Sequence, residues 1–149
     1  MKLAMADSVQ QDQSVVPVSP ERHGTRRWRR FTSYSFAKGL RDVPVVLAEI
    51  EPAASAFPLV SKKTNESWDV LALLAVSDRT CGIFITREGN WRGTYVPSGL
   101  RAYPFVAETT GADGQNVLMI DESSGLVTDD PQDELFFDEN GQVGRALAE

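Results

Sequence analysis

The clearest pattern along the chain is an unbroken apolar run at residues 70–76, which contains no polar position. A short apolar run of this kind is consistent with a strand that is buried on both faces of a sheet. Residues 59–62 precede it and are expected to form a shorter strand. Residues 15–20 alternate apolar and polar positions around two prolines. This alternation favours a strand along a sheet edge, because proline is tolerated there.

Turn residues predict antiparallel pairing in the second half of the chain. Turns that contain glycine separate β-type segments, and short connections of this kind are typical of hairpins. A further turn at residues 123–125 leads into a strand at 126–128. The predicted hairpins, each given as strand, turn and strand, are 82–86, 87–89 and 90–96, followed by 105–109, 111–114 and 116–121.

One of these turns has a second version later in the chain. Residues 135–141 resemble residues 83–89, because each segment is an aromatic strand end followed by a polar turn that a glycine closes. The resemblance predicts that the same hairpin turn is used twice.

Two short helices are expected among the strands. Glu51 and Pro52 favour a helix start, since acid suits the first turn and proline suits the first helical position. This helix is predicted over residues 53–57, and Pro58 ends it. Ser98 is expected to cap a second helical turn, which Pro104 ends. The elements together predict an α+β fold that is strand-dominated, with mainly antiparallel hairpins and short inserted helices.

Composition agrees with one folded domain. The chain has 149 residues, of which 42% are hydrophobic and 24% are charged, and a domain of this size can bury a core. Residues 1–13 are polar and aperiodic, which predicts a flexible tail before a single domain at 14–149. No segment approaches the ~18 apolar residues that span a bilayer, and the N-terminus does not read as a secretory signal. We therefore expect a cytoplasmic protein without a membrane span.

Charge is unevenly distributed between the two parts of the chain. Residues 1–63 carry ten basic and six acidic groups, whereas residues 64–149 carry five basic and fifteen acidic groups. Residues 22–30 contain five arginines and a tryptophan, which could bind phosphates and stack a base. The net charge of −6 argues against a nucleic-acid partner. A plainer expectation is that these arginines pair with the acidic second part.

The residue inventory excludes several kinds of chemistry. His23 is the one histidine and Cys81 the one cysteine, so the chain cannot build a zinc site. The acidic run that starts at Asp129 fails the calcium-loop spacing, and no phosphate-binding loop is present. We assign no catalytic residue, metal or cofactor. His23 is expected to be a surface or hydrogen-bonding residue, and Cys81 a small buried residue in a β segment.

Residues 91–105 form the most unusual segment of the chain. Alternation predicts that Trp91, Gly93 and Tyr95 share one face of a strand, opposite Arg92, Thr94 and Val96. In one interpretation the aromatic rings are core and the arginines stack on them. In the other, the rings line a pocket in which two arginines receive an anion such as a carboxylate. The ligand-binding candidates are Trp91, Arg92, Tyr95, Arg101 and Tyr103.

The same segment resembles the SapC-like family of bacterial proteins. The resemblance rests on Trp-Arg-Gly-x-Tyr-Val-Pro at 91–97 and Leu-Arg-x-Tyr-Pro-Phe at 100–105, and it extends from about residue 15 to 141. The family name implies a connection with bacterial surface layers, and no catalytic residues follow from it. Some relatives carry transporter-permease labels, which do not suit a chain without a predicted membrane span. Family members usually continue further, so we expect this chain to lack a C-terminal segment.

These observations favour a non-catalytic accessory or binding protein that recognises a peptide or protein partner. One alternative is an enzyme, or an enzyme subunit, of unknown reaction. Another is a structural protein associated with a surface layer or the cell envelope. We lean towards a protein without catalysis, and the sequence indicates no oligomeric state.

Overall fold

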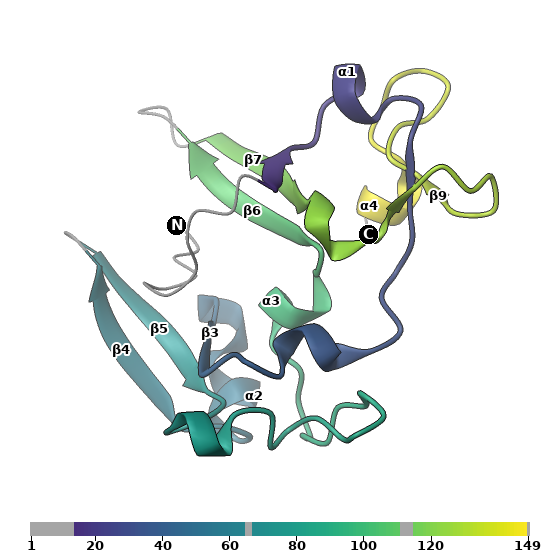
Figure 1. The fold of residues 1–149 in the computed structure, drawn as a ribbon. Helices are drawn as coiled ribbons and strands as arrows, with labels where there is room; N and C mark the ends of the chain where they lie inside the picture. The colour runs from purple at the N-terminus through teal and green to yellow at the C-terminus, as the bar shows by residue number, and fades with distance from the viewer. Residues whose placement is uncertain (1–13, 65–66, 111–114, 149) are drawn as a thin grey trace. The chain divides into compact units, whose positions relative to one another are not determined.

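The computed structural model describes residues 14–64, 67–110 and 115–148 (Figure 1). The predicted tail at 1–13 and the predicted turn at 111–114 lie outside these residues. The chain divides into two compact units, which we describe separately. The described part of unit 1 is 14–31, 104–110 and 115–148, and that of unit 2 is 32–64 and 67–103. The single domain expected at 14–149 stays a prediction.

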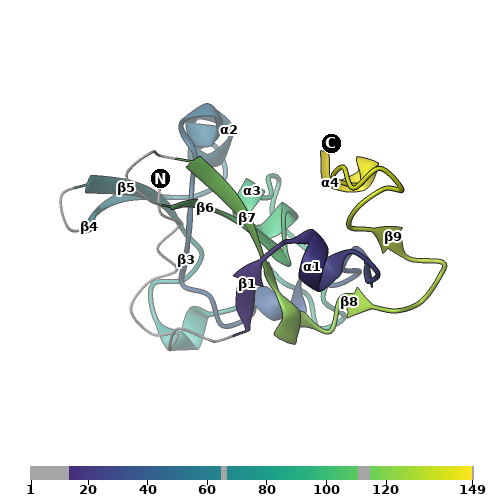
Figure 2. The same cartoon turned by 90° about the horizontal axis from the view of Figure 1, so that it is seen from above.

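Unit 1 is built on an antiparallel three-stranded sheet in which β7 is central. The strands β6 and β7 form the second predicted hairpin, and β1 lies along the other side of β7 (Figures 1 and 2). The prediction that the segment at 15–20 follows a sheet edge is therefore confirmed for residues 15–17, whereas Pro20 begins a helix. The sheet contains β1 (Val15–Pro17), β6 (Phe105–Thr110) and β7 (Gln115–Asp121).

The remaining elements of unit 1 are short. Strand β2 pairs with both β8 and β9 in a second antiparallel sheet. The core contains Trp28, Phe105, Ile120, Phe136 and Phe137. The elements are α1 (Pro20–His23), β2 (Arg27–Trp28), η4 (Glu122–Ser124), β8 (Val127–Thr128), β9 (Glu134–Leu135) and α4 (Arg145–Ala148).

Unit 2 has its own antiparallel sheet, in the order β3-β5-β4. Leu71 and Ala72 are adjacent in the central strand β5, so their side chains point to opposite faces, and both are buried. The predicted strand buried on both faces is therefore confirmed for residues 70–73, whereas residues 74–76 lie beyond the end of β5. The strands are β3 (Asp42–Pro44), β4 (Leu59–Thr64) and β5 (Ser67–Leu73).

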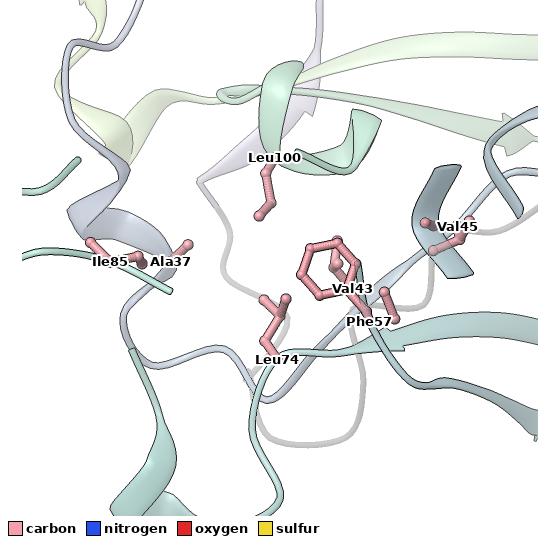
Figure 3. Close-up of a cluster of buried hydrophobic side chains, with 9 residues drawn as sticks. Ala37, Val43, Val45, Phe57, Leu74, Ile85 and Leu100 are labelled. Atoms are coloured by element: carbon pink, nitrogen blue, oxygen red, sulfur yellow. The ribbon is translucent and has the colours of Figure 1, made fainter. Parts of the chain in front are cut away.

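Short helices surround the core of unit 2. Figure 3 shows Val43, Phe57, Leu74 and Leu100 pointing toward one another, and each is buried. The helices are η1 (Tyr34–Ala37), η2 (Leu47–Glu49), α2 (Ile50–Ala54), η3 (Asp78–Thr80) and α3 (Ser98–Arg101). Both units combine antiparallel sheets with short helices, which confirms the predicted α+β class.

The two sheets share one plan of strand pairing. A Val-Pro-Val sequence runs through the edge strand of each unit, at residues 16–18 and 43–45. In unit 1 the third residue of this sequence donates its backbone N–H to Leu118 at 2.9 Å, and in unit 2 it donates to Val70 at 2.8 Å. In each sheet the first valine and the first residue of the hairpin face the same central residue, Ile120 in unit 1 and Ala72 in unit 2.

The predicted strands at 82–86 and 90–96 are wrong. The segment contains turns, a single antiparallel bridge between Ile85 and Trp91, and no regular strand. The indole N–H of Trp91 donates to the carbonyl oxygen of Tyr95 at 2.8 Å. This local bond bends the chain back on itself, so the segment after the bridge does not extend into a strand.

The repeated turn, in contrast, is confirmed. Thr86 N–H donates to the Asn90 carbonyl at 2.8 Å, and Asp138 N–H donates to the Gln142 carbonyl at the same distance. In both turns a glycine has positive φ, 91° at Gly89 and 74° at the matching glycine, residue 141. The second turn ends in the bridge between residues 137 and 143, so each unit contains one copy.

Two further expectations are corrected. The helix predicted at 53–57 begins earlier, at Ile50, and ends at Ala54. Pro52 lies in its first turn, where no backbone N–H is required. Cys81 lies in a turn and is half-buried, not in a buried strand. Its thiol donates to the Ser77 carbonyl at 3.6 Å.

Candidate functional site

A buried carboxylate organises the unusual segment at 91–105. Glu49 ends η2 and is 6% exposed. Its Oε1 accepts hydrogen bonds from the Tyr95 hydroxyl at 2.6 Å, the Ser98 backbone N–H at 2.7 Å and Nη2 of Arg101 at 3.0 Å. Its Oε2 accepts from the Ser98 hydroxyl at 2.6 Å. The four bonds satisfy a charge that would otherwise be costly to bury.

Ser98 begins α3 but does not cap it as predicted. It is the first residue of the helix, after Pro97. The backbone N–H of a first helical residue has no partner within the helix. Glu49 supplies that partner, and it also binds the hydroxyl that would have made the cap. The side chain that fixes the start of α3 therefore comes from a distant part of the sequence.

Arg101 lies at the surface side of this arrangement. Its side chain is 55% exposed although one of its nitrogens contacts the buried carboxylate of Glu49. The guanidinium carbon also lies 5.7 Å from the centre of the Tyr95 ring, within the range of a cation–π contact. Two contacts therefore hold the guanidinium in one position while much of it faces solvent.

Two ionisable groups are shifted by this network. Burial would raise the pKa of Glu49, but hydrogen bonds from Ser98, Tyr95 and Arg101 outweigh it, and the pKa lies below its ordinary value. The hydrogen bond to this carboxylate, together with desolvation, raises the pKa of the Tyr95 hydroxyl. Both shifts favour an ionised carboxylate beside a neutral tyrosine.

Trp91 supports Tyr95 from the core. Its indole binds the Tyr95 backbone, and its ring stacks on Phe84 with centroids 5.6 Å apart. The Tyr34 ring is 5.5 Å away and the Phe57 ring 6.2 Å away. Trp91 is therefore a packing residue, as the core interpretation of the aromatic rings expected.

The other two candidates have separate surroundings. Arg92 is exposed, and its guanidinium makes no hydrogen bond or ion pair with the described residues. Tyr103 stacks on Phe36, with ring centroids 3.9 Å apart. Hydrogen bonds thus join Trp91, Tyr95 and Arg101 through Glu49 and the Tyr95 backbone. Sequence reasoning missed Glu49, although an acid between Ala48 and Ile50 in an apolar stretch could have indicated it.

In unit 1 the prediction that the basic segment at 22–30 pairs with acidic residues is confirmed for Arg22 and Arg26. Arg22 contacts the Glu122 carboxylate through two nitrogens, with Nε at 2.8 Å. Arg26 donates to Asp129 at 3.0 Å, and the Arg27 side chain donates to the carbonyl of residue 133 at 2.8 Å. These contacts involve three of the five arginines, whereas Arg29 and Arg30 are exposed.

His23 is a buried hydrogen-bonding residue and not a surface one. Its Nδ1 accepts the Ser19 backbone N–H at 3.2 Å, and its Nε2 lies 3.2 Å from Oε1 of Glu122. The ring packs on Phe136 at 4.8 Å. Each ring nitrogen thus has a structural partner.

The described residues contain no group of three or more His, Cys, Asp or Glu side chains placed to hold a metal ion. Among those same residues, none of the helices is long and apolar enough to cross a membrane.

Comparison with known proteins places the chain in a family. The SapC family model matches residues 18–149, which is nearly the whole chain. The chain therefore belongs to the SapC family. No curated protein and no solved structure matches it.

Proposed function

We propose that this SapC-family chain is a non-catalytic binding protein that recognises a peptide or protein partner. The observation that carries the proposal is the exposed guanidinium of Arg101, held by Glu49 and by the Tyr95 ring. A carboxylate of the partner would be the group that Arg101 binds. We further propose a cytoplasmic location.

The position of Arg101 suits anion recognition. One terminal nitrogen is used by Glu49, and the remaining nitrogens make no hydrogen bond to the described residues. A guanidinium can offer two parallel N–H donors to a carboxylate. Because Glu49 and Tyr95 already restrict the side chain, less conformational entropy is lost on binding.

The same network argues against catalysis by its own acid. Glu49 accepts four hydrogen bonds, and its lowered pKa makes it a weak proton acceptor. The enzyme alternative rests on one observation, which is that the hydroxyls of Tyr95 and Ser98 both bind the acid Glu49. It would be favoured if a substrate analogue shifted the Tyr95 ring resonances and Ser98→Ala abolished turnover. The surface-layer alternative would be favoured by self-assembly of the native protein.

Selection from a displayed library of random peptides tests the binding proposal. Wild type should enrich peptides whose one carboxylate is an Asp, a Glu or the free terminus, and Arg101→Ala should lose this enrichment. Arg87→Ala is the matched control, because Arg87 is an exposed arginine of the same unit without a side-chain partner among the described residues. Equal enrichment by Arg101→Ala and wild type, with both proteins folded by circular dichroism, would contradict the proposal.

A further inference from the structure

The sheet of unit 2 has two edges with different chemistry. On the β3 side, Val45 N–H donates to Val70 and Leu74 N–H donates to the carbonyl of Arg41. Hydrogen-bonding directions alternate along a strand. Because Val45 bonds to β5, the backbone of Pro44, one position earlier, faces away from β5. Proline has no N–H to offer a further strand. At Pro44, the last residue of β3, this edge therefore has no outward N–H for a partner strand.

Among the described residues, β4 pairs with β5 and with no other strand. Leu73 N–H donates to the Pro58 carbonyl at 2.9 Å. The next pair along the two strands is Leu59 with Ala72, where the register of β4 with β5 begins. By the same alternation, the backbone groups of Leu59, Ser61 and Lys63 point outward. They make no backbone hydrogen bond to the described residues. A row of unpaired donors and acceptors of this kind is a template for an additional strand.

The side chains beside this edge are basic and aromatic. Lys62 and Lys63 are exposed on β4. Lys62 lies opposite Asp69, whereas Lys63 lies opposite Trp68, which is 66% exposed. Val60 is 38% exposed on the same strand. The edge therefore combines positive charge with exposed apolar surface in a chain whose net charge is −6.

We propose that the β4 edge binds an extended acidic segment of a partner protein by strand addition. The free backbone groups would bind any extended chain, and the two lysines select an acidic one. A second copy of β4 would bring its own lysines against these, and like charges across a strand pair are destabilising. The lysines thus discourage non-specific edge pairing and favour an acidic partner. This site is separate from Arg101 and does not depend on the function proposed for it.

Two synthetic peptides provide the probe. In one, glutamate alternates with valine and threonine, and in the other lysine replaces each glutamate. The glutamate peptide should slow hydrogen exchange at the backbone amides of Leu59, Ser61 and Lys63, and the lysine peptide should not. Absence of protection at millimolar glutamate peptide, or equal protection by both peptides, would overturn the proposal.

Proline variants test the backbone contribution. Ser61→Pro removes an outward N–H and leaves the bonds to β5 in place, so it should weaken the glutamate peptide about tenfold. Ala107→Pro is the matched control, because Ala107 holds the corresponding outward position on β6, two residues after the one that faces Ile120. It should leave the affinity unchanged. Equal binding by Ser61→Pro and wild type would overturn the proposal.

Two further variants keep the test decisive if Ser61→Pro fails to fold. Lys63→Glu, at an exposed position, should also weaken the glutamate peptide about tenfold and should bind the lysine peptide instead. In Arg101→Ala the glutamate peptide should protect the backbone amides of Leu59, Ser61 and Lys63 as it does in wild type. Loss of that protection in Arg101→Ala would make it depend on Arg101 and overturn the proposal for β4. Unchanged affinity in Lys63→Glu would overturn it as well.

Discussion

Tyr95 donates a hydrogen bond of 2.6 Å to Oε1 of Glu49, a residue 46 positions earlier in the chain. The bond joins the aromatic segment to the end of a 3-10 helix, η2. It also fixes the ring over which Arg101 lies. The positions of Tyr95 and Arg101 in unit 2 therefore depend on one buried carboxylate.

Glu49→Gln should lower the free energy of unfolding by about 1–3 kcal/mol, because the buried donors lose a charged acceptor. Urea denaturation followed by circular dichroism measures the change. Glu51→Gln is the control, since Glu51 is exposed two positions away, and it should change stability by less than about 0.5 kcal/mol. Equal effects of the two substitutions would show that the four hydrogen bonds of Glu49 do not stabilise the fold.

Stability should also depend on pH through Glu122. Hydrogen bonds and charge attraction from Arg22, helped by His23 and opposed by desolvation, lower the pKa of this carboxyl from 4.5 to about 2. A carboxyl whose folded pKa is depressed stabilises the folded state above its unfolded pKa. That contribution is lost as the pH falls from about 5 toward 2.

Urea denaturation across this pH range should show the fall in wild type and a shallower fall in Glu122→Gln. Glu139→Gln, a change at an exposed residue, should keep the wild-type slope. Added salt should reduce the difference, since Arg22 is 55% exposed. A wild-type slope in Glu122→Gln would contradict the prediction.

The two copies of the repeated turn should differ in their tolerance of a side chain. Gly89 and Gly141 both have positive φ, where an alanine costs roughly 1–2 kcal/mol. A Cβ at Gly89 would also overlap the Ser33 hydroxyl, which binds the N–H of residue 35, whereas a Cβ at Gly141 meets open space. Gly89→Ala should therefore be the more destabilising change in thermal unfolding, and the reverse order would refute this explanation.

His23 should occupy a single neutral tautomer. The Ser19 backbone N–H can only donate, so Nδ1 must accept and carries no proton. In a neutral imidazole the one ring proton is then on Nε2, which faces Glu122. Nitrogen-15 NMR of the ring at neutral pH should show a protonated Nε2 and an unprotonated Nδ1. The opposite pattern would mean that the Ser19 bond is absent in solution. Glu122→Gln should leave Nδ1 unprotonated, because the Ser19 bond does not involve residue 122.

Local pattern alone determined several parts of this protein. Proline at residue 17 identified an edge strand because an outward N–H is not needed there. The segments at 105–109 and 116–121 form a hairpin because their alternation and the short connection between them act within one stretch of chain. The glycines at 89 and 141 close the same turn because glycine, which has no Cβ, readily adopts the positive φ that the turn requires.

The tertiary structure decided which of the unusual side chains act together. Glu49 meets Ser98 across 49 positions and Arg101 across 52, and no local periodicity encodes such a meeting. The contact of Trp91 with the Tyr95 carbonyl likewise replaced a strand that alternation had favoured. Buried polar groups must find partners wherever the fold brings them. Residues 91–105 indicated the family from sequence, whereas the exposed, supported position of Arg101 came from the buried carboxylate beneath it.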